Sequence, residues 1–169
     1  TINDQGQTFP YLAYISTELT ADENLQGSPT ITSIVEGRIV KVWNGSAWVQ
    51  QYSNNPAWCI LDFLTNKRYG LGIDEQYIDL DSFISVANYC DELVNDDQGG
   101  QEKRFQLDYV LDTKKSSLDY LKEMLATFGG YLLYSQGELR LKIDGPETPV
   151  QHFNMDNIVK DSFSYSKAS

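Results

Sequence analysis

Carboxylates are the most frequent reactive groups in this chain, and three close pairs of them could supply a general acid and a general base. The pairs are Asp74 with Glu75, Asp79 with Asp81, and Asp91 with Glu92. A glycosidase needs two carboxyl groups about 5 to 9.5 Å apart in a cleft. Neighbouring residues of a helix point in different directions, and acids in such positions usually cap helices or face solvent. We therefore expect structural roles for these acids. A peptidoglycan-degrading domain is the weakest of the functional alternatives.

Nucleophiles and metal ligands are scarce. His152 is the only histidine, and no serine or cysteine motif accompanies it in "PVQHFNMDN". Cys59 and Cys90 are too few for a disulfide framework or for the usual zinc spacings, and a reducing compartment is the default expectation. The segment "NDDQGGQE" lacks the frame of a calcium loop. We expect no catalytic residue, cofactor or metal, and buried free thiols, with a Cys59–Cys90 bridge left open.

Four residues near the middle of the chain could bind a partner or an anion. Gly70 and Gly72 resemble the start of a phosphate loop, but the lysine and serine of that motif do not follow, so they indicate the end of a helix. Arg68 and Tyr69 could form an interchain contact. In the alternative, Tyr69 packs on the neighbouring helix and Arg68 pairs with a local acid.

The tryptophans raise the possibility of sugar binding, because aromatic faces stack on sugar rings. Trp43 and Trp48 flank a predicted hairpin turn, where cross-strand aromatic pairing is the ordinary explanation. A carbohydrate or receptor-binding module would expose its aromatic residues as a patch. We keep this class as the main alternative to a structural role.

Composition excludes several partners. The chain has 169 residues, 41% hydrophobic positions and a formal charge of -11, from 13 basic and 24 acidic residues. It can bury a core, and its charge repels polyanions, so we expect no nucleic-acid contact. No apolar run approaches the roughly 20 residues that span a bilayer, so we expect no membrane insertion by this segment. The chain starts at Thr1 and stops at "SFSYSKAS", which we interpret as a piece of a longer polypeptide.

The first region, residues 1–52, is predicted to be an antiparallel β region. Residues 9–20 and 31–43 alternate and are rich in β-branched and aromatic side chains. Asn44-Gly45 follows the second of these runs and is typical of a tight type I′ turn.

The second region, residues 53–100, is predicted to be helical. Asn54 or Asn55 can cap a helix, and Pro56 suits its first turn. Asp62 is the only charged residue between Ala57 and Leu64, so this helix must be buried on most sides. We predict that it forms a wedge between two layers. The wedge residues are Pro56, Trp58, Leu61 and Leu64.

A second helix follows, opened by Asp79 or Asp81. Its apolar positions, which have helical spacing, are Phe83, Ala87, Cys90 and Val94. A turn-rich connector leads to the third region, residues 101–169. There we predict a strand over 104–112, a helix over 114–128, and a hairpin over 131–143 around Ser135-Gln136-Gly137. The helix would place Leu118, Leu121, Leu125 and Phe128 on one face. The fold class is α+β, and packing of the three regions as a single domain is the alternative to separate units.

"YSNNPAWCILDFLTNKRYGLG", residues 52–72, closely resembles a segment of the lambda-like phage tail tip attachment protein J family. In that family, an Asn-Pro-Ala-Trp start leads through an apolar helix to Thr-x-x-Arg-Tyr-Gly-x-Gly. "NYCDELVNDDQGGQEKRFQLDYVL" is similar to the family's next segment, and the helix and hairpin match it in order and spacing. The resemblance covers most of the chain from about Phe9 onward, including "FSYS" near the end.

The resemblance implies a non-enzymatic segment of the central hub, which joins the tail tube to the tip and takes part in host attachment. It implies a fold like that of tail hub and baseplate domains and a trimer of the chain about the tail axis. The implied partners are other tail tip and tail tube proteins. The implied location is the tail tip of a phage or prophage virion, reached from the host cytoplasm during assembly. On this basis, Arg68 and Tyr69 are predicted to lie at or near an interface.

Overall fold

The computed structural model describes residues 16–20, 27, 30–145, 149–154, 156–160 and 162–166. The chain divides into two compact units, Thr1–Val35 and Glu36–Ser169. In the first unit, the described residues form no helix or strand. The strand expected over 9–20 therefore falls partly on residues 9–15, which lie outside the described residues, and it is absent from 16–20. The region boundaries expected near residues 52 and 100 stay a prediction.

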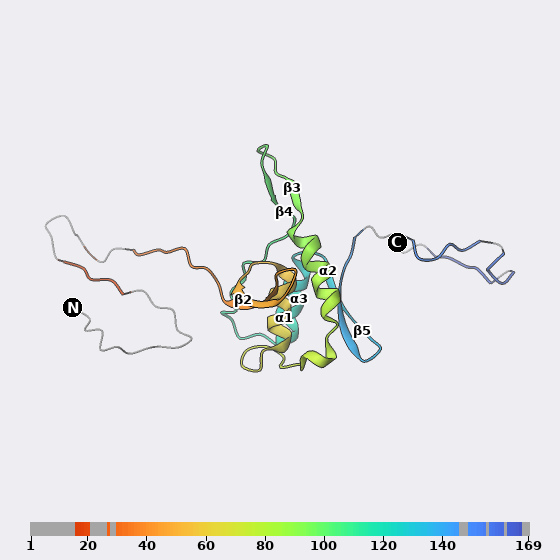
Figure 1. The fold of residues 1–169 in the computed structure, drawn as a ribbon, viewed down its shortest axis with the longest axis horizontal. Coiled ribbons are helices and arrows are strands. Elements are labelled where there is room, and N and C mark those ends of the chain that lie inside the picture. Colours follow the sequence, from red (N-terminus) through yellow and green to blue (C-terminus); the bar gives the residue numbers. More distant parts are fainter. Residues whose placement is uncertain are drawn as a thin grey trace. The chain divides into compact units, whose positions relative to one another are not determined.

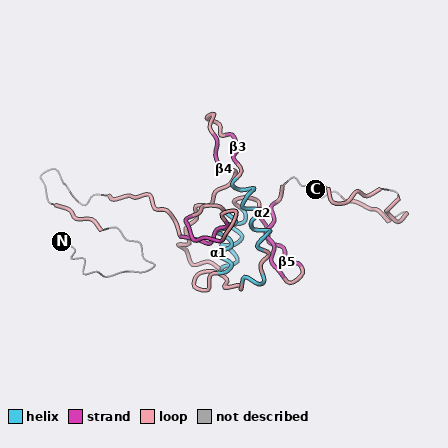
Figure 2. Tube along the Cα trace, viewed as in Figure 1, coloured by secondary structure: helices cyan, strands magenta, loops and turns pink. Residues whose placement is uncertain are grey.

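The second unit contains the helices and strands of the described chain (Figure 1). They are β1 (Ile39–Trp43), β2 (Trp48–Tyr52), α1 (Pro56–Thr65), η1 (Glu75–Tyr77), α2 (Leu80–Asp91), β3 (Leu93–Asn95), β4 (Gln101–Lys103), α3 (Ser117–Ala126), β5 (Gly130–Ser135) and β6 (Glu138–Ile143). The strands pair as three separate antiparallel hairpins, β1–β2, β3–β4 and β5–β6. Figure 2 shows the helices between hairpins, as expected for an α+β fold.

The β1–β2 hairpin is shorter than predicted. Its register runs from Ile39↔Tyr52 to Trp43↔Trp48. Residues 31–38 form no strand, which corrects the prediction for 31–43, because β2 has no residues left to pair with them. The turn is also not a two-residue type I′ turn. Four residues connect the strands, only Gly45 has a positive φ, and the Asn44 carboxamide oxygen accepts hydrogen bonds from the backbone N–H groups of Ser46 and Ala47.

Helix α2 begins where the sequence predicted, with the Asp79 side chain accepting a hydrogen bond from the Ser82 N–H. Phe83, Ala87 and Cys90 are buried as expected. Val94 does not belong to the helix, because the chain turns at Glu92 and enters β3. The predicted connector is thus the β3–β4 hairpin, which continues beyond the C-terminal end of α2 in Figure 1.

Residues 104–112, predicted as a strand, form an extended segment without a ladder partner, which we call the strap. Single backbone hydrogen bonds hold it: Phe105 N–H donates to the Cys90 carbonyl (3.1 Å), and Leu107 N–H donates to the Asn54 carbonyl (2.7 Å). Leu107 is buried, and Phe105 and Tyr109 pack against the core. The alternation that predicted a strand therefore reflects burial of every second side chain against the helices, without sheet pairing.

Helix α3 is shorter than the predicted 114–128. Ser116 caps it by accepting a hydrogen bond from the Asp119 N–H. Its buried face holds Tyr120, Leu121 and Met124, with Phe128 beyond its end, whereas Leu118 is 56% exposed. The prediction that Leu118 belongs to the buried face is wrong, because Leu118 lies in the first turn of α3, at the margin of that face, where its side chain is open to solvent.

The hairpin predicted over 131–143 is confirmed as β5–β6. Its register ends at Ser135↔Glu138, leaving a two-residue turn. Both turn residues, Gln136 and Gly137, have positive φ (56° and 88°), the geometry of a type I′ turn. Of the helices that the structure describes, none combines the length and the apolar character that crossing a bilayer requires.

Candidate assembly interface

Helix α1 lies at the centre of the packed unit. It contacts β1, α2 and α3. All four predicted wedge residues are buried, with Trp58 3%, Leu61 1% and Leu64 0% exposed and Pro56 among the fully buried side chains. The helix is apolar nearly all round, so it can meet neighbours on several sides at once. The mechanical role predicted for these residues, a wedge between two layers, stays a prediction.

Asn55 fixes the start of this helix to α2. Its Oδ1 accepts a hydrogen bond from the Ala57 N–H (3.0 Å), which caps α1. Its Nδ2 donates to the Ala87 carbonyl in α2 (2.9 Å). Asn55 is 1% exposed, and both ends of its carboxamide are used. The side chain is therefore a rigid polar joint between two helices.

The loop after α1 folds back on the end of the helix. Leu71 N–H donates to the Phe63 carbonyl (2.9 Å) and Ile73 N–H to the Leu64 carbonyl (2.8 Å), so backbone groups satisfy carbonyls that the helix leaves unpaired. A Cβ at Gly70 would lie 1.9 Å from the Phe63 carbonyl oxygen. Glycine is therefore required at position 70 by close backbone approach, and the loop presents residues 67–69 on a fixed support.

Arg68 and Tyr69 have different surroundings on this loop. Arg68 is exposed, and none of the ion pairs between described residues includes it. The Tyr69 hydroxyl donates to the Asp62 carboxylate, and the Arg38 guanidinium lies 4.8 Å from the centre of the Tyr69 ring. Burial, followed by the neighbouring Asp62, raises the pKa of Tyr69 above its ordinary value. The neutral phenol is thus held in place as a hydrogen-bond donor.

A cavity of roughly 160 Å³ lies beside this cluster. Val40, Phe63, Leu107 and Met124 give it apolar walls, and Arg38, Asp62 and Tyr69 give it a polar rim. Arg38 and Asp62 form an ion pair at 3.8 Å. The strap closes one side of the cavity with Leu107, Asp108, Tyr109 and Leu111.

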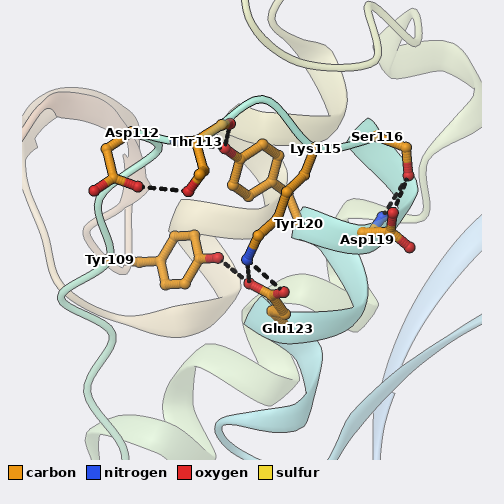
Figure 3. Close-up of polar contacts among 8 residues, drawn as sticks. All are labelled: Tyr109, Asp112, Thr113, Lys115, Ser116, Asp119, Tyr120 and Glu123. Atoms are coloured by element: carbon orange, nitrogen blue, oxygen red, sulfur yellow. Dashed lines mark hydrogen bonds and ion pairs between the residues drawn. The ribbon is translucent and has the colours of Figure 1, made fainter.

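Polar contacts with α3 hold the strap (Figure 3). The Tyr109 hydroxyl donates to Glu123, and Lys115 Nζ donates to both oxygens of the same carboxylate (2.8 and 2.9 Å). These hydrogen bonds, that from Lys115 first, lower the pKa of Glu123. The Tyr120 hydroxyl donates to the Thr113 carbonyl. The chain between the strap and α3 is thus attached at two points to the same helix face.

The acids considered for catalysis have structural partners. Asp74 and Glu75 pair with Lys67 (3.4 Å) and Lys41 (2.6 Å). Asp91 and Glu92 pair with Lys103 and Arg104, each at 2.6 Å. Asp79 caps α2 and pairs with Arg140 at 3.2 Å, and Asp81 is exposed.

His152 is exposed. The thiols are free, with Cys90 fully buried, so the structure contains no Cys59–Cys90 bridge. Burial raises the pKa of Cys59 to about 11 and that of Cys90 to about 12. Within the described part of the chain, no three acidic, cysteine or histidine side chains gather as metal ligands.

The tryptophans pack on one another. The Trp43 and Trp48 ring centres are 5.5 Å apart across the hairpin, which confirms cross-strand pairing, and Trp48 meets Trp58 edge-on at 5.6 Å. An open hollow of about 710 Å³ lies beside Trp43 and Trp58, with Gln51, Asn88 and Asp91 among its polar walls.

Several residues of this site were not identified from the sequence. Arg38, from the segment before β1, and the link between Asn55 and Ala87 depend on contacts between distant residues. Asp62 could have been identified from the sequence, because it is the single charged residue within an apolar helix. A charged side chain in a mostly buried helix indicates a polar partner beside it, and in the structure that partner is Tyr69.

The sequence of the chain is similar to those of three phage proteins. The chain is 33% identical over 129 residues to the tip attachment protein J of Escherichia phage SECphi27, covering 75% of the chain and 11% of that protein. It is 27% identical over 185 aligned positions to the tip attachment protein J of Escherichia phage SECphi4, covering 99% of the chain and 16% of that protein. It is 29% identical over 150 residues to the baseplate hub protein pb3 of Escherichia phage T5, covering 78% of the chain and 16% of that protein.

These relatives define the class as phage tail tip and baseplate hub proteins. Within that class, the chain is a region related to tip attachment protein J, which confirms the resemblance carried by residues 52–72. The chain spans 11% to 16% of the length of these relatives. No protein-family model matches it.

Proposed function

We propose that this chain is a non-enzymatic structural segment of the central hub at a phage or prophage tail tip. The similarity to proteins named for tip attachment and for the baseplate hub is the observation that carries the proposal. In this proposal, the hub joins the tail tube to the tip, takes part in host attachment, and contacts other tail tip and tail tube proteins. It reaches the virion tail tip after synthesis in the host cytoplasm.

The packing supports a mechanical role. Helix α1 contacts β1, α2 and α3, and its wedge residues Pro56, Trp58, Leu61 and Leu64 are buried in these contacts. Close-packed interiors have low compressibility and transmit strain. A force on the β1–β2 hairpin therefore reaches the other helices through α1 instead of bending a linker.

The loop after α1 supports a contact surface for another copy of the chain. Arg68 is exposed on a loop whose backbone is hydrogen-bonded to α1, and Tyr69 beside it is held by Asp62. An exposed arginine on a rigid support loses little freedom on binding, which favours it as an interface residue. We propose that Arg68 contacts a neighbouring copy in a trimer about the tail axis, with Tyr69 supporting it.

Two experiments test these statements separately. Gold-labelled antibodies against the chain should mark the tail tip in electron micrographs of tailed particles that contain it. Labelling confined to the head or to the tube wall would refute the tail-tip assignment.

Light scattering over a concentration series should then show self-association that is weakened at least tenfold by Arg68→Glu. The matched control is Lys122→Glu, at an exposed lysine of α3 that takes part in none of the ion pairs between described residues. Equal effects of the two variants would refute a specific role for Arg68.

A carbohydrate-binding or receptor-binding module is the second candidate, favoured by the hollow beside Trp43 and Trp58. Tryptophan fluorescence during titration with cell-envelope sugars tests it. A saturable change that Asn88→Ala abolishes would support this class over a purely structural role.

A further inference from the structure

The β5–β6 hairpin has one protected edge and one open edge. On the β6 side, Asp79 N–H donates to the Leu139 carbonyl (2.9 Å), and Leu141 N–H donates to the Ser82 hydroxyl (3.0 Å). The start of α2 therefore covers the edge of β6. Three of the six residues of β6 are also charged, Glu138, Arg140 and Lys142, and charge on an edge opposes pairing with another strand.

The edge of β5 is neither covered by a helix nor lined with charged residues. A two-residue turn makes Ser135↔Glu138 the closing hydrogen-bonded pair, so Leu133 and Tyr131 bond to β6 and the alternate residues point away from it. The outward residues are Gly130, Leu132 and Tyr134. Among the described residues, no hydrogen bond outside the hairpin uses their backbone groups. The strand "GYLLYS" contains no charged residue and no proline.

Apolar side chains accompany this open edge. Tyr131 and Leu133 are each 48% exposed, and Tyr134 is 69% exposed. An exposed apolar edge strand with free backbone groups is a template for an added strand, and soluble proteins usually block such an edge. β5 therefore has the features of a strand-acceptor site.

The same chain contains a segment with matching properties. Residues 162–166, "SFSYS", are uncharged and alternate serine with aromatic residues, which is the pattern of a strand with one apolar face. Phe163 is 70% and Tyr165 is 86% exposed. In the structure, these five residues belong to no sheet. They follow the end of β6 by 18 residues, from 144 to 161, and such a length of chain can reach roughly 60 Å.

We propose that residues 162–166 of one copy add as a third strand to the β5 edge of a second copy. Backbone hydrogen bonds would satisfy Gly130, Leu132 and Tyr134, and Phe163 and Tyr165 would cover exposed apolar side chains of β5. The donor and the acceptor are different surfaces, so the contact is heterologous and can close a ring of three copies. This inference rests on the proposed self-assembly of the hub and adds a second contact to the one proposed for Arg68.

Two variants separate the donor from the acceptor. Leu133→Lys places a charge on the exposed face of β5 and leaves the donor segment intact. The double variant Phe163→Ser with Tyr165→Ser removes the apolar face of the donor and leaves β5 intact. Each should weaken self-association in light scattering at least tenfold. Leu118→Lys, at a leucine that is 56% exposed on α3, is the matched control and should leave it unchanged.

Mixing the two defective variants is the decisive measurement. The mixture contains one intact donor and one intact acceptor, so it should form a complex of two chains with near wild-type affinity. Failure to form that complex would overturn the proposal, and so would self-association of the double variant at wild-type strength, which would indicate β5 pairing with itself. A wild-type chain that stays monomeric at all concentrations would also overturn it, whereas gold labelling at the tail tip would still support the structural function.

Discussion

Removing the Asn55 side chain tests whether it joins α1 to α2. In Asn55→Ala, the Ala57 N–H loses its acceptor, and loss of a helix cap costs about 1 kcal/mol. The hydrogen bond to the Ala87 carbonyl is lost as well, and a typical net contribution is also about 1 kcal/mol. Because Asn55 is buried, water cannot easily replace either partner. We expect the free energy of unfolding to fall by about 2 to 3 kcal/mol.

Asn55→Asp separates the two functions of the side chain. An aspartate retains the acceptor for the Ala57 N–H, but it places an oxygen where Nδ2 now donates to the Ala87 carbonyl. Burial opposes its ionisation. The folded-state pKa of this carboxyl should therefore be raised above its unfolded value, and the protonated acid can donate to Ala87. Relative to the parent chain, the variant should gain stability as the pH is lowered and lose it as the pH rises.

Urea denaturation followed by circular dichroism measures both effects, provided that the slope of free energy against urea is unchanged. Asn54→Ala is the matched control, because Asn54 is only partly buried and its Nδ2 bonds the exposed Gln106 side chain (2.9 Å). We expect it to cost less than about 1 kcal/mol. If Asn55→Ala costs no more than Asn54→Ala, Asn55 does not join the helices.

Three further predictions follow from the loop, the thiols and the strap. Gly70→Ala should destabilise the chain more than Gly72→Ala, for which we expect a loss of roughly 1 to 2 kcal/mol. Gly72 has only a positive φ of 65°, whereas a Cβ at Gly70 would meet a carbonyl oxygen. Equal losses of stability in urea denaturation would contradict the close approach at Gly70. Burial raises the pKa of Cys59 to about 11, so little of the reactive thiolate is present at pH 8.5. Cys59 should therefore react with iodoacetamide about 100-fold more slowly than a free thiol at that pH. A rate near that of glutathione would contradict the burial of this thiol. Glu123→Gln should speed amide hydrogen exchange over residues 109–115, because Tyr109 and Lys115 lose a charged acceptor. Because the pKa of Glu123 is lowered, protonating it at low pH should reduce the protection of the same amides in the parent chain, with each rate taken relative to the intrinsic exchange rate at that pH. The same change of pH should have little further effect in Glu123→Gln.

Most locally encoded features were predictable from the sequence, although the type of turn at Asn44-Gly45 was not. The cap at Asn55, the proline in the first turn of α1, the Asp79 cap of α2 and the β5–β6 turn all depend on residues within a few positions of one another. Burial of α1 followed from its composition alone. These signals specify helices and turns before any tertiary contact forms.

Two of the failed predictions, the strands over 104–112 and 31–43, concern pairing between distant segments. The strap alternates like a strand, but a ladder also needs a partner with free backbone groups, and the alternation says nothing about that partner. The same holds for residues 31–38. The contact between Arg38 and Tyr69 joins the segment before β1 to the loop after α1, and neither local sequence specifies the other.

The three hairpins share no ladder with one another. An insertion in one turn therefore shifts no register in the other two. The β3–β4 turn, with exposed Gly99 and Gly100, lies in a hairpin whose main contacts are internal. It is the natural position for an epitope tag or a fluorophore that leaves the helices undisturbed, and it would allow the chain to be followed inside an assembled particle.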